Sequence, residues 1–366
     1  MKLSWLIQLN CAVLLSTSLA LICTTTLADT RALSSTRDIS WNEGELVENG
    51  PLASFQLQFP LLAQADSGDN VTASSDGSAK KQQYTQAEIN EMINNPLGEL
   101  WMLFTQNDTT WYDGDALDFL GEDKKVFNTT TLMPVMPFQL TENWKYIFRP
   151  VVPIHHWDAP NVSEGNTQYP GGDLPVSVNF DKQTELGDIV LWNALATDEM
   201  ARPPNIFGFG VTAMLDTATD DVFGTGKWSA GPMGLAFHVG PPGGWILGTV
   251  VQHWWDFAGD DEREDVNMTN IQYVAFYRLT AETNIGFGSP NITANWEADS
   301  DDVWTVPVGL GWNTTTKLGP LPVKIGVEAY KYVEKPDNFG ADYGLRLIFS
   351  PVVPKPAFSK RPIFGG

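Results

Sequence analysis

The chain has 366 residues and a formal net charge of -22, with 44 acidic side chains against 22 basic ones. A negative excess of this size repels nucleic-acid phosphates, and no basic patch offsets it, so we expect no nucleic-acid partner. The length allows two or three domains, although an all-β barrel can run this long as a single unit. Fourteen Trp and nineteen Phe are many for so polar a chain. Aromatic belts at two membrane interfaces would account for them, and the core of a large soluble β-sandwich is the alternative.

The first 28 residues have the pattern of a secretory signal peptide. Lys2 precedes a long apolar run that ends in small residues at Ala28, which predicts cleavage before Asp29. An uncleaved membrane anchor is the alternative. Both cysteines, Cys11 and Cys23, lie inside this segment, so the mature chain is expected to use neither disulfides nor thiolate chemistry.

The next part of the chain carries little strand pattern. Segment 29–84 is rich in Ser, Asp, Gly and Asn, which predicts a disordered periplasmic arm. Thr85 and Glu88 have the spacing of a capping box and Pro96 ends the pattern, so a short helix is expected over 85–96. The domain organisation predicted from the sequence is therefore a signal peptide over 1–28, an arm over 29–84, a helix over 85–96, a β-barrel over 97–352 and a tail over 353–366.

From Gly98 onward the chain alternates bulky apolar with small or polar side chains at period two, which is the pattern of β-strands. The alternating segments are 98–112, 126–140, 144–156, 187–197, 206–217, 228–240, 243–255, 267–280, 283–296, 303–315, 321–333 and 341–352. Their connections alternate long and short, with a long loop expected over 157–186 and short turns at 141–143 and 281–282. Outer-membrane barrels have this alternation, so the sequence predicts an all-β fold, a closed antiparallel transmembrane β-barrel of about 12 strands.

The same period indicates which side chains face the lumen, the interior of the barrel. A charge that faces lipid costs roughly 2 to 4 kcal/mol at the membrane midplane, so the favoured register turns every charge inward. Symmetric closure of the last hairpin places Glu328 opposite Arg346. The predicted lumen-lining residues are Lys145, Arg149, Arg278, Lys324, Glu328, Asp342 and Arg346. Two interpretations stay open: the charges select solutes in an open pore, or paired charges fill a narrow barrel and block it.

Two further expectations concern the strands themselves. In segment 228–240 the bulky apolar face carries Leu235 and Phe237, so we expect that face to meet lipid and His238 to point into the lumen. A register that pairs Leu140 with Trp144 brings Pro134 opposite Pro150. Since proline donates no ladder hydrogen bond, bulges or a weakened seam are expected there.

The acidic loops could bind hard cations such as calcium or magnesium, although no spacing matches an EF-hand and solvated loops are the alternative. The weak candidates for metal ligands are Asp260, Asp261, Glu262, Asp299 and Asp301. No zinc spacing, phosphate loop or serine elbow is present, so we expect no cofactor and no enzyme. An outer-membrane phospholipase-like barrel enzyme is an alternative function; it would need a serine beside a histidine such as His155 or His156 near the rim.

Several stretches resemble a family of bacterial outer-membrane β-barrel proteins labelled as transporters. The matching stretches are NNPLGELWMLFTQND from Asn94, MPFQLTENWKYIFRPVVPI from Met136, LGDIVL from Leu186, DTATDDVFGTGKWSAGP from Asp216, NITANWEADSDDVWTVPVGLG from Asn291 and FGADYGLRL from Phe339. Some members carry the misleading name neuromedin U, and the family is distantly similar to the phenol-degradation meta-pathway barrel proteins. The resemblance covers the whole predicted barrel and implies no catalytic residues.

The sequence therefore predicts an outer-membrane channel or transporter for a small solute in a Gram-negative bacterium, with outer-membrane lipid as its surroundings and divalent cations as possible partners of its outer loops. A structural or adhesive barrel without transport is the other alternative.

Overall fold

The computed structural model describes residues 101–198, 205–288, 290–319 and 321–353. The predicted signal peptide, arm and short helix lie outside this part of the chain, as does the tail beyond residue 353.

The described residues form strands joined by short turns at one end of the molecule and by longer connections at the other. These elements are β1 (Trp101–Asp113), α3 (Asp115–Leu120), β2 (Lys125–Gln139), β3 (Trp144–Tyr169), β4 (Gly172–Leu186), β5 (Ile189–Thr197), β6 (Asn205–Leu215), η1 (Asp221–Phe223), β7 (Lys227–Val239), β8 (Trp245–Gly259), β9 (Asn267–Arg278), β10 (Thr283–Phe287), β11 (Ile292–Asn295), β12 (Trp304–Leu318), β13 (Leu321–Glu334) and β14 (Gly340–Val353).

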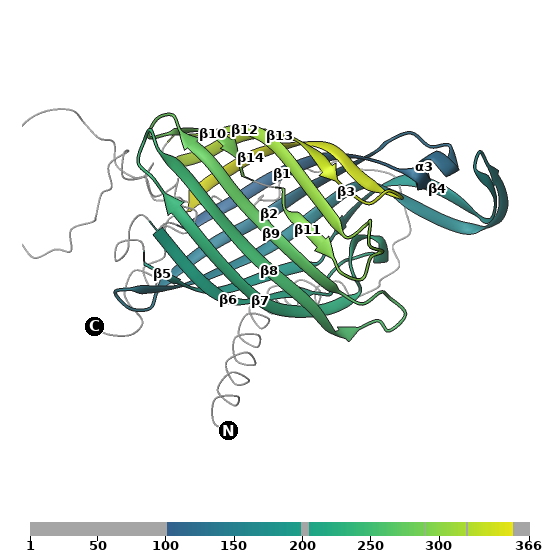
Figure 1. The fold of residues 1–366 in the computed structure, drawn as a ribbon, viewed down its shortest axis with the longest axis horizontal. Helices are drawn as coiled ribbons and strands as arrows, with labels where there is room; N and C mark the ends of the chain where they lie inside the picture. Colours follow the sequence, from purple (N-terminus) through teal and green to yellow (C-terminus); the bar gives the residue numbers. More distant parts are fainter. Residues whose placement is uncertain (1–100, 199–204, 289, 320, 354–366) are drawn as a thin grey trace, which may run out of the picture. The chain divides into compact units, whose positions relative to one another are not determined.

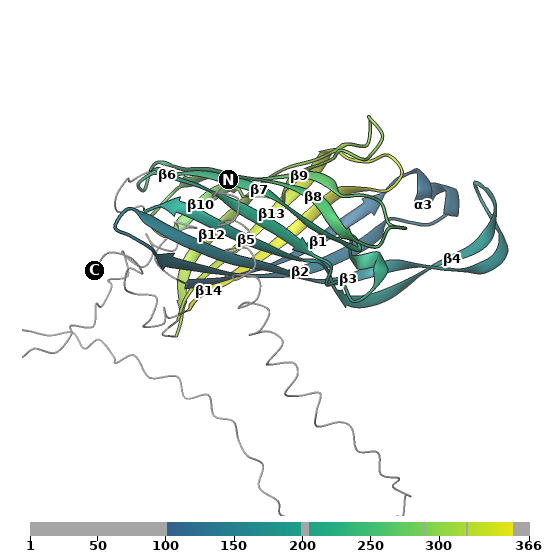
Figure 2. The same cartoon turned by 90° about the horizontal axis from the view of Figure 1, so that it is seen from below.

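These strands close into a barrel, because β1 pairs antiparallel with β2 on one side and with β14 on the other. Two positions in the wall are each filled by a broken strand. The strand β5 pairs with the first half of β3 and β4 with its second half, while β10 and β11 both lie between β9 and β12. The fourteen strands therefore make a wall of twelve, seen from two directions in Figures 1 and 2. The predicted closed barrel of about 12 antiparallel strands is confirmed.

The expected long loop over 157–186 is wrong. The strand β3 continues to Tyr169 and β4 returns from Gly172, so this part is a two-stranded hairpin that projects beyond the wall beside α3 (Figure 1). The amide of Gly171 at its tip donates a hydrogen bond of 3.0 Å to the carbonyl of Phe119. Beyond Trp157 the hairpin pairs with no other strand, and most of its side chains are polar. A ribbon with polar residues on both faces has no period-two apolar signal, so its composition resembles that of a loop.

The interior of the barrel contains an apolar cluster. Leu235 and Phe237 of β7 are buried inside the wall, whereas His238 faces outward and its Nδ1 lies 2.8 Å from Oδ1 of the exposed Asn205. The expected orientation of this strand is therefore wrong. The period separates two faces, but it does not say which face is inside when the interior is itself packed with apolar side chains. The buried members of this cluster are Val135, Ile147, Trp192, Ala194, Ala196, Ile206, Met233, Leu235, Phe237 and Val250.

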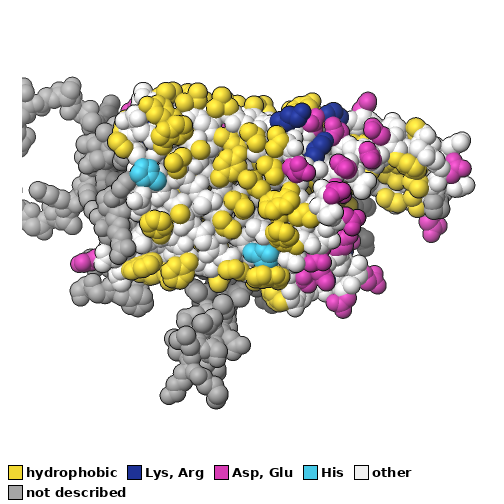
Figure 3. All heavy atoms as spheres, viewed as in Figure 1, with side chains coloured by type: hydrophobic (Ala, Val, Ile, Leu, Met, Phe, Trp, Pro, Cys, Tyr) yellow, Lys and Arg dark blue, Asp and Glu magenta, His cyan; other side chains and the backbone are white. Residues whose placement is uncertain are grey.

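The outer surface of the wall is also rich in apolar side chains. Figure 3 shows hydrophobic side chains spread over the wall, while Asp and Glu gather at the end that carries α3 and β4. Exposed tryptophans lie toward both ends: Trp144 and Trp245 at the short turns, Trp255 and Trp304 near the longer connections. An apolar band between two aromatic belts is the exterior that a lipid-facing barrel requires. No helix within the described ranges is long and apolar enough to cross a membrane.

The β2–β3 ladder has the predicted register. Leu132 pairs with Val152 and Met136 pairs with Phe148, so Pro134 lies opposite Pro150. The register is the same on both sides of the two prolines, and the expected bulge is absent. Instead the pairing is interrupted over the residues between these two pairs, which leaves a seam in the wall.

Candidate lumenal binding site

The charged residues predicted to line the lumen lie at three levels of the barrel. Lys145 and Arg278 are near the short turns, where both are almost completely buried. The Arg278 guanidinium donates a 2.7 Å hydrogen bond through Nη1 to the carbonyl of Gly240 in the turn between β7 and β8. Neither residue contributes to the interior cavity described below, so both belong to the floor of the barrel at its short-turn end.

Asp342 lies at the opposite end. It forms ion pairs with Lys124, in the connection between α3 and β2, and with Lys331 at 3.9 Å. Lys124 also pairs with Asp113 at 2.7 Å, and the hydrogen bonds that its ammonium donates to these two carboxylates raise the pKa of Lys124 above its ordinary value. These contacts tie the α3–β2 connection to the ends of β1 and β14 at the rim, away from the middle of the lumen.

The other four predicted residues, Arg149, Lys324, Glu328 and Arg346, line one cavity inside the barrel. Glu328 and Arg346 are direct partners in the β13–β14 ladder, as predicted, with Oε2 and Nη1 4.0 Å apart. Arg346 also donates a 2.7 Å hydrogen bond through Nε to Oδ1 of Asp108. Sequence reasoning missed Asp108. Its even position on β1 could have indicated an inward side chain, but its partner depends on how the first and last strands meet.

The Asp108 carboxylate is the centre of a small polar network. The hydroxyl of Tyr330 donates to its Oδ1 at 3.1 Å and lies 3.3 Å from Oγ1 of Thr110. Because β1, β13 and β14 contribute to this network, it joins the two ends of the described sheet inside the lumen.

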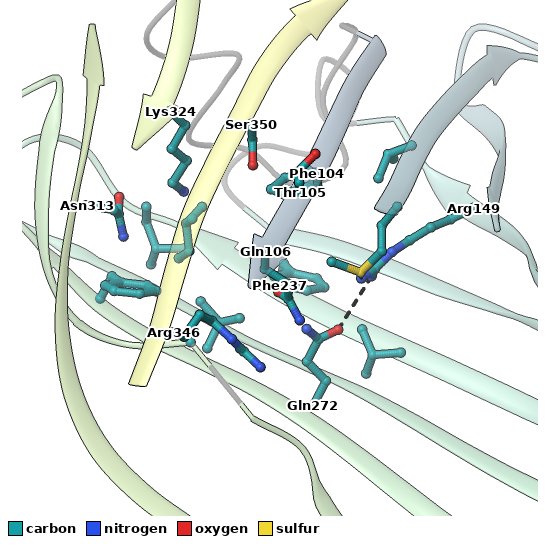
Figure 4. Close-up of a pocket in the computed structure, with 18 of the residues that line it drawn as sticks. Phe104, Thr105, Gln106, Arg149, Phe237, Gln272, Asn313, Lys324, Arg346 and Ser350 are labelled. Carbon is teal, nitrogen blue, oxygen red and sulfur yellow. Dashed lines mark hydrogen bonds between the residues drawn. The ribbon is translucent and has the colours of Figure 1, made fainter. Parts of the chain in front are cut away.

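The cavity has a volume of about 120 Å³ and two different walls. The strands β5, β7 and β8 and parts of their neighbours supply apolar side chains, whereas β12, β13 and β14 supply polar ones. Figure 4 shows Lys324, Asn313 and Arg346 on one side and Arg149 on the other. The apolar lining is Phe104, Met133, Val135, Ile147, Trp192, Ala194, Leu235, Phe237, Ile246, Val250, Val274, Phe276 and Ile348; the polar lining is Thr105, Gln106, Arg149, Gln272, Asn284, Asn313, Lys324, Glu328, Arg346 and Ser350, with Gly288 between the broken halves of the wall.

Arg149 is the cation of the apolar wall. Its guanidinium carbon lies 3.9 Å from the ring centre of Trp192, and Nη1 is 3.5 Å from Oε1 of Gln272. Cations are attracted to the face of a tryptophan ring, so this stacking orients the guanidinium without neutralising it. No carboxylate lies within ion-pair distance of Arg149 in the part of the chain that the structure describes.

The acidic loops and the histidines contain the metal and catalytic candidates of the sequence. Within the described ranges, no group of three or more His, Cys, Asp or Glu side chains could hold a metal ion, which includes the five acidic candidates of the outer loops. The four histidines have hydrogen-bond partners of two kinds, hydroxyl and amide: Thr129 for His155, Thr184 for His156, Asn205 for His238 and Thr269 for His253. None of these bonds is the serine–histidine pair that an acyl-transfer enzyme requires.

The fold and this site define an antiparallel β-barrel with an apolar exterior and an amphipathic interior cavity. No family model matches the chain, and no curated protein matches it. Among solved structures the chain is similar to an outer membrane channel from Pseudomonas putida F1, with a TM-score of 0.48 and 14% identity over 69% of this chain and 96% of that one. It is also similar to a Pseudomonas aeruginosa FadL homologue, with a TM-score of 0.33 and 9% identity over 70% and 90% of the two chains. A bacterial polysaccharide outer membrane secretin gives a TM-score of 0.28 and 10% identity over 70% and 99%.

Proposed function

We propose that this chain is an outer-membrane channel or transporter that takes a small solute through its lumen. The observation that carries the proposal is the cavity inside the barrel, because it combines an apolar wall with polar groups and with two cations, Lys324 and Arg149, that lack a carboxylate within ion-pair distance in the described chain. A barrel that served only as a scaffold would gain stability by pairing those groups or replacing them with apolar side chains. The apolar exterior with its tryptophans toward both ends supports a place in a membrane.

The cavity also suggests how a variant can block the lumen without disturbing the exterior. Ala194 lies on the apolar wall of the cavity and is 2% exposed, so Ala194→Phe would place a ring inside it. Ala329 faces outward from β13, so Ala329→Phe adds the same group on the lipid side.

The test is osmotic swelling of liposomes that contain the refolded full chain, in solutions of small sugars and of small organic salts. We expect swelling with the natural sequence and with Ala329→Phe, and much slower swelling with Ala194→Phe. A chain that folds and inserts but admits no solute would instead support a structural or adhesive barrel. Equal swelling rates for the natural sequence and the two variants would show that solute does not pass through the cavity. The phospholipase-like alternative gains no support from the histidine contacts.

A further inference from the structure

The polar wall of the cavity contains a row of hydrogen-bond donors on three adjacent strands. Lys324 of β13 lies opposite Thr315 of β12 in one ladder and opposite Ser350 of β14 in the other. Thr315 and Ser350 are buried, at 5% and 0% exposure, and the hydroxyl of neither has a hydrogen-bond partner. Of the two, Ser350 lines the cavity and Thr315 lies beside the lining. Asn313, two residues before Thr315, is 1% exposed and its Nδ2 is likewise without a partner. Figure 4 shows Lys324, Ser350 and Asn313 on the same side of the cavity.

The unpaired groups in this row can all donate hydrogen bonds. Lysine has three N–H donors and no acceptor, and the amide nitrogen of asparagine donates only. Buried polar groups are almost always hydrogen-bonded, since leaving one unpaired costs about 1 to 3 kcal/mol, so such a row calls for a ligand that brings acceptors. Among the described residues, Lys324 forms no ion pair within 4 Å and no hydrogen bond.

The neighbouring cation is already compensated. Arg346 is held by Asp108 at 2.7 Å and faces Glu328 at 4.0 Å, so its positive charge is already paired within the barrel. Lys324 and Arg149 are the two cations on the cavity wall that lack a carboxylate within ion-pair distance in the described chain. Both favour an anion, and Lys324 alone stands within a row of further donors.

The apolar wall across the cavity determines the size of the apolar group that the ligand can carry. Trp192, Phe237 and Val250 are buried and apolar, and they line the cavity across from the donor row. A dry apolar cavity of about 150 Å³ holds one benzene molecule, so a volume of 120 Å³ fits an apolar group no larger than a single ring or a short alkyl chain.

We infer that this cavity binds a small monocarboxylate with a compact apolar body. The carboxylate accepts hydrogen bonds from Lys324, Ser350 and Asn313, and the apolar body packs on Trp192 and Phe237. The inference deepens the proposed function and rests on it, because it names the class of solute that the lumen takes.

The test measures binding by isothermal titration calorimetry on the refolded full chain in detergent, with hexanoate and benzoate as probes. Hexanamide and benzamide are the matched neutral ligands, which have nearly the same shape but no charge. Lys324→Met removes the cation from the row, and Lys331→Met is its control, because Lys331 lies on the same strand with a side chain that is 71% exposed. Circular dichroism confirms that each variant folds.

We expect the natural sequence and Lys331→Met to bind each carboxylate about tenfold more tightly than the matching amide, since a hydrogen bond to a charged group contributes that much. Lys324→Met should lose this preference. Ser350→Ala, which keeps the charge and changes little volume, should weaken carboxylate binding about fivefold, whereas Thr315→Val, a change outside the cavity lining, should leave it unaltered. These two variants carry the test if Lys324→Met does not fold.

Equal affinity for carboxylates and amides in the natural sequence would overturn the inference, as would a preference that survives in Lys324→Met or a carboxylate affinity that is unchanged in Ser350→Ala. The swelling assay separates this result from the proposed function. Solute entry without carboxylate preference refutes the binding site and leaves the channel, whereas carboxylate binding without entry refutes the channel and leaves the site.

Discussion

Asp108 and Arg346 face each other across the ladder that joins the first and last strands of the barrel, with Oδ1 and Nε 2.7 Å apart. The two residues are 238 positions apart in the chain. Both side chains are largely removed from solvent, at 15% and 5% exposure, so removing either partner leaves a poorly solvated charge where the barrel closes.

Asp108→Asn should destabilise the folded barrel by about 3 to 5 kcal/mol, because it removes the carboxylate that lies 2.7 Å from the buried Arg346 guanidinium. Guanidinium-induced unfolding in detergent micelles measures the difference. Lys331→Gln is the control, since this exposed side chain should contribute less than about 1 kcal/mol. A loss below about 1 kcal/mol in Asp108→Asn would show that this pair does not stabilise the closure.

Replacing Pro134 and Pro150, at the interruption between β2 and β3, is expected to raise the unfolding free energy of the barrel. Both side chains lie on outward positions of β2 and β3, where valine fits a strand that faces lipid. The double variant Pro134→Val with Pro150→Val restores two backbone donors, so we expect the barrel to gain about 1 kcal/mol in unfolding free energy. Hydrogen exchange at residues 133–135 should slow at the same time. Unchanged exchange there would mean that the prolines do not cause the interruption.

Asp188, between β4 and β5, fixes the connection that follows β6. Its Oδ1 accepts from the amides of Thr217 and Ala218 at 3.1 and 3.2 Å, and Oδ2 accepts from the amide and hydroxyl of Thr225 at 2.7 and 2.8 Å. Asp188→Ala should release residues 216–226 while leaving the wall folded, because hydrogen bonds to a charged group contribute about 1.5 to 3 kcal/mol each.

Limited proteolysis with a protease of broad specificity measures this release as faster cleavage within residues 216–226. The matched control is Asp216→Ala, an exposed acidic side chain in the same connection. Equal cleavage rates in the two variants would contradict the role assigned to Asp188.

Much of the wall could be predicted from the sequence, because a strand with two chemically different faces has a period of two wherever it lies. The hairpin registers followed from the same pattern: Glu328 lies opposite Arg346, and Pro134 lies opposite Pro150. These relations are local, since each strand pairs with the next one along the chain.

What could not be predicted depends on non-local packing. In β7 the bulky face turns inward because the interior holds an apolar cluster with Trp192 and Ile147, which one strand cannot reveal. Asp108 gains its role only where β1 meets β14. Arg278 and Lys145 are buried inside the barrel near the short turns. Their position outside the cavity depends on contacts with those turns, such as the hydrogen bond from Arg278 to the carbonyl of Gly240.

The most direct test of the central claim is a planar-bilayer recording of the refolded full chain at low protein concentration. The account predicts discrete, small conductance steps, reduced in amplitude or frequency by Ala194→Phe and unchanged by Ala329→Phe. Inserted protein that gives no steps above the bare bilayer, or steps that Ala194→Phe leaves unaltered, would contradict a solute path through this cavity.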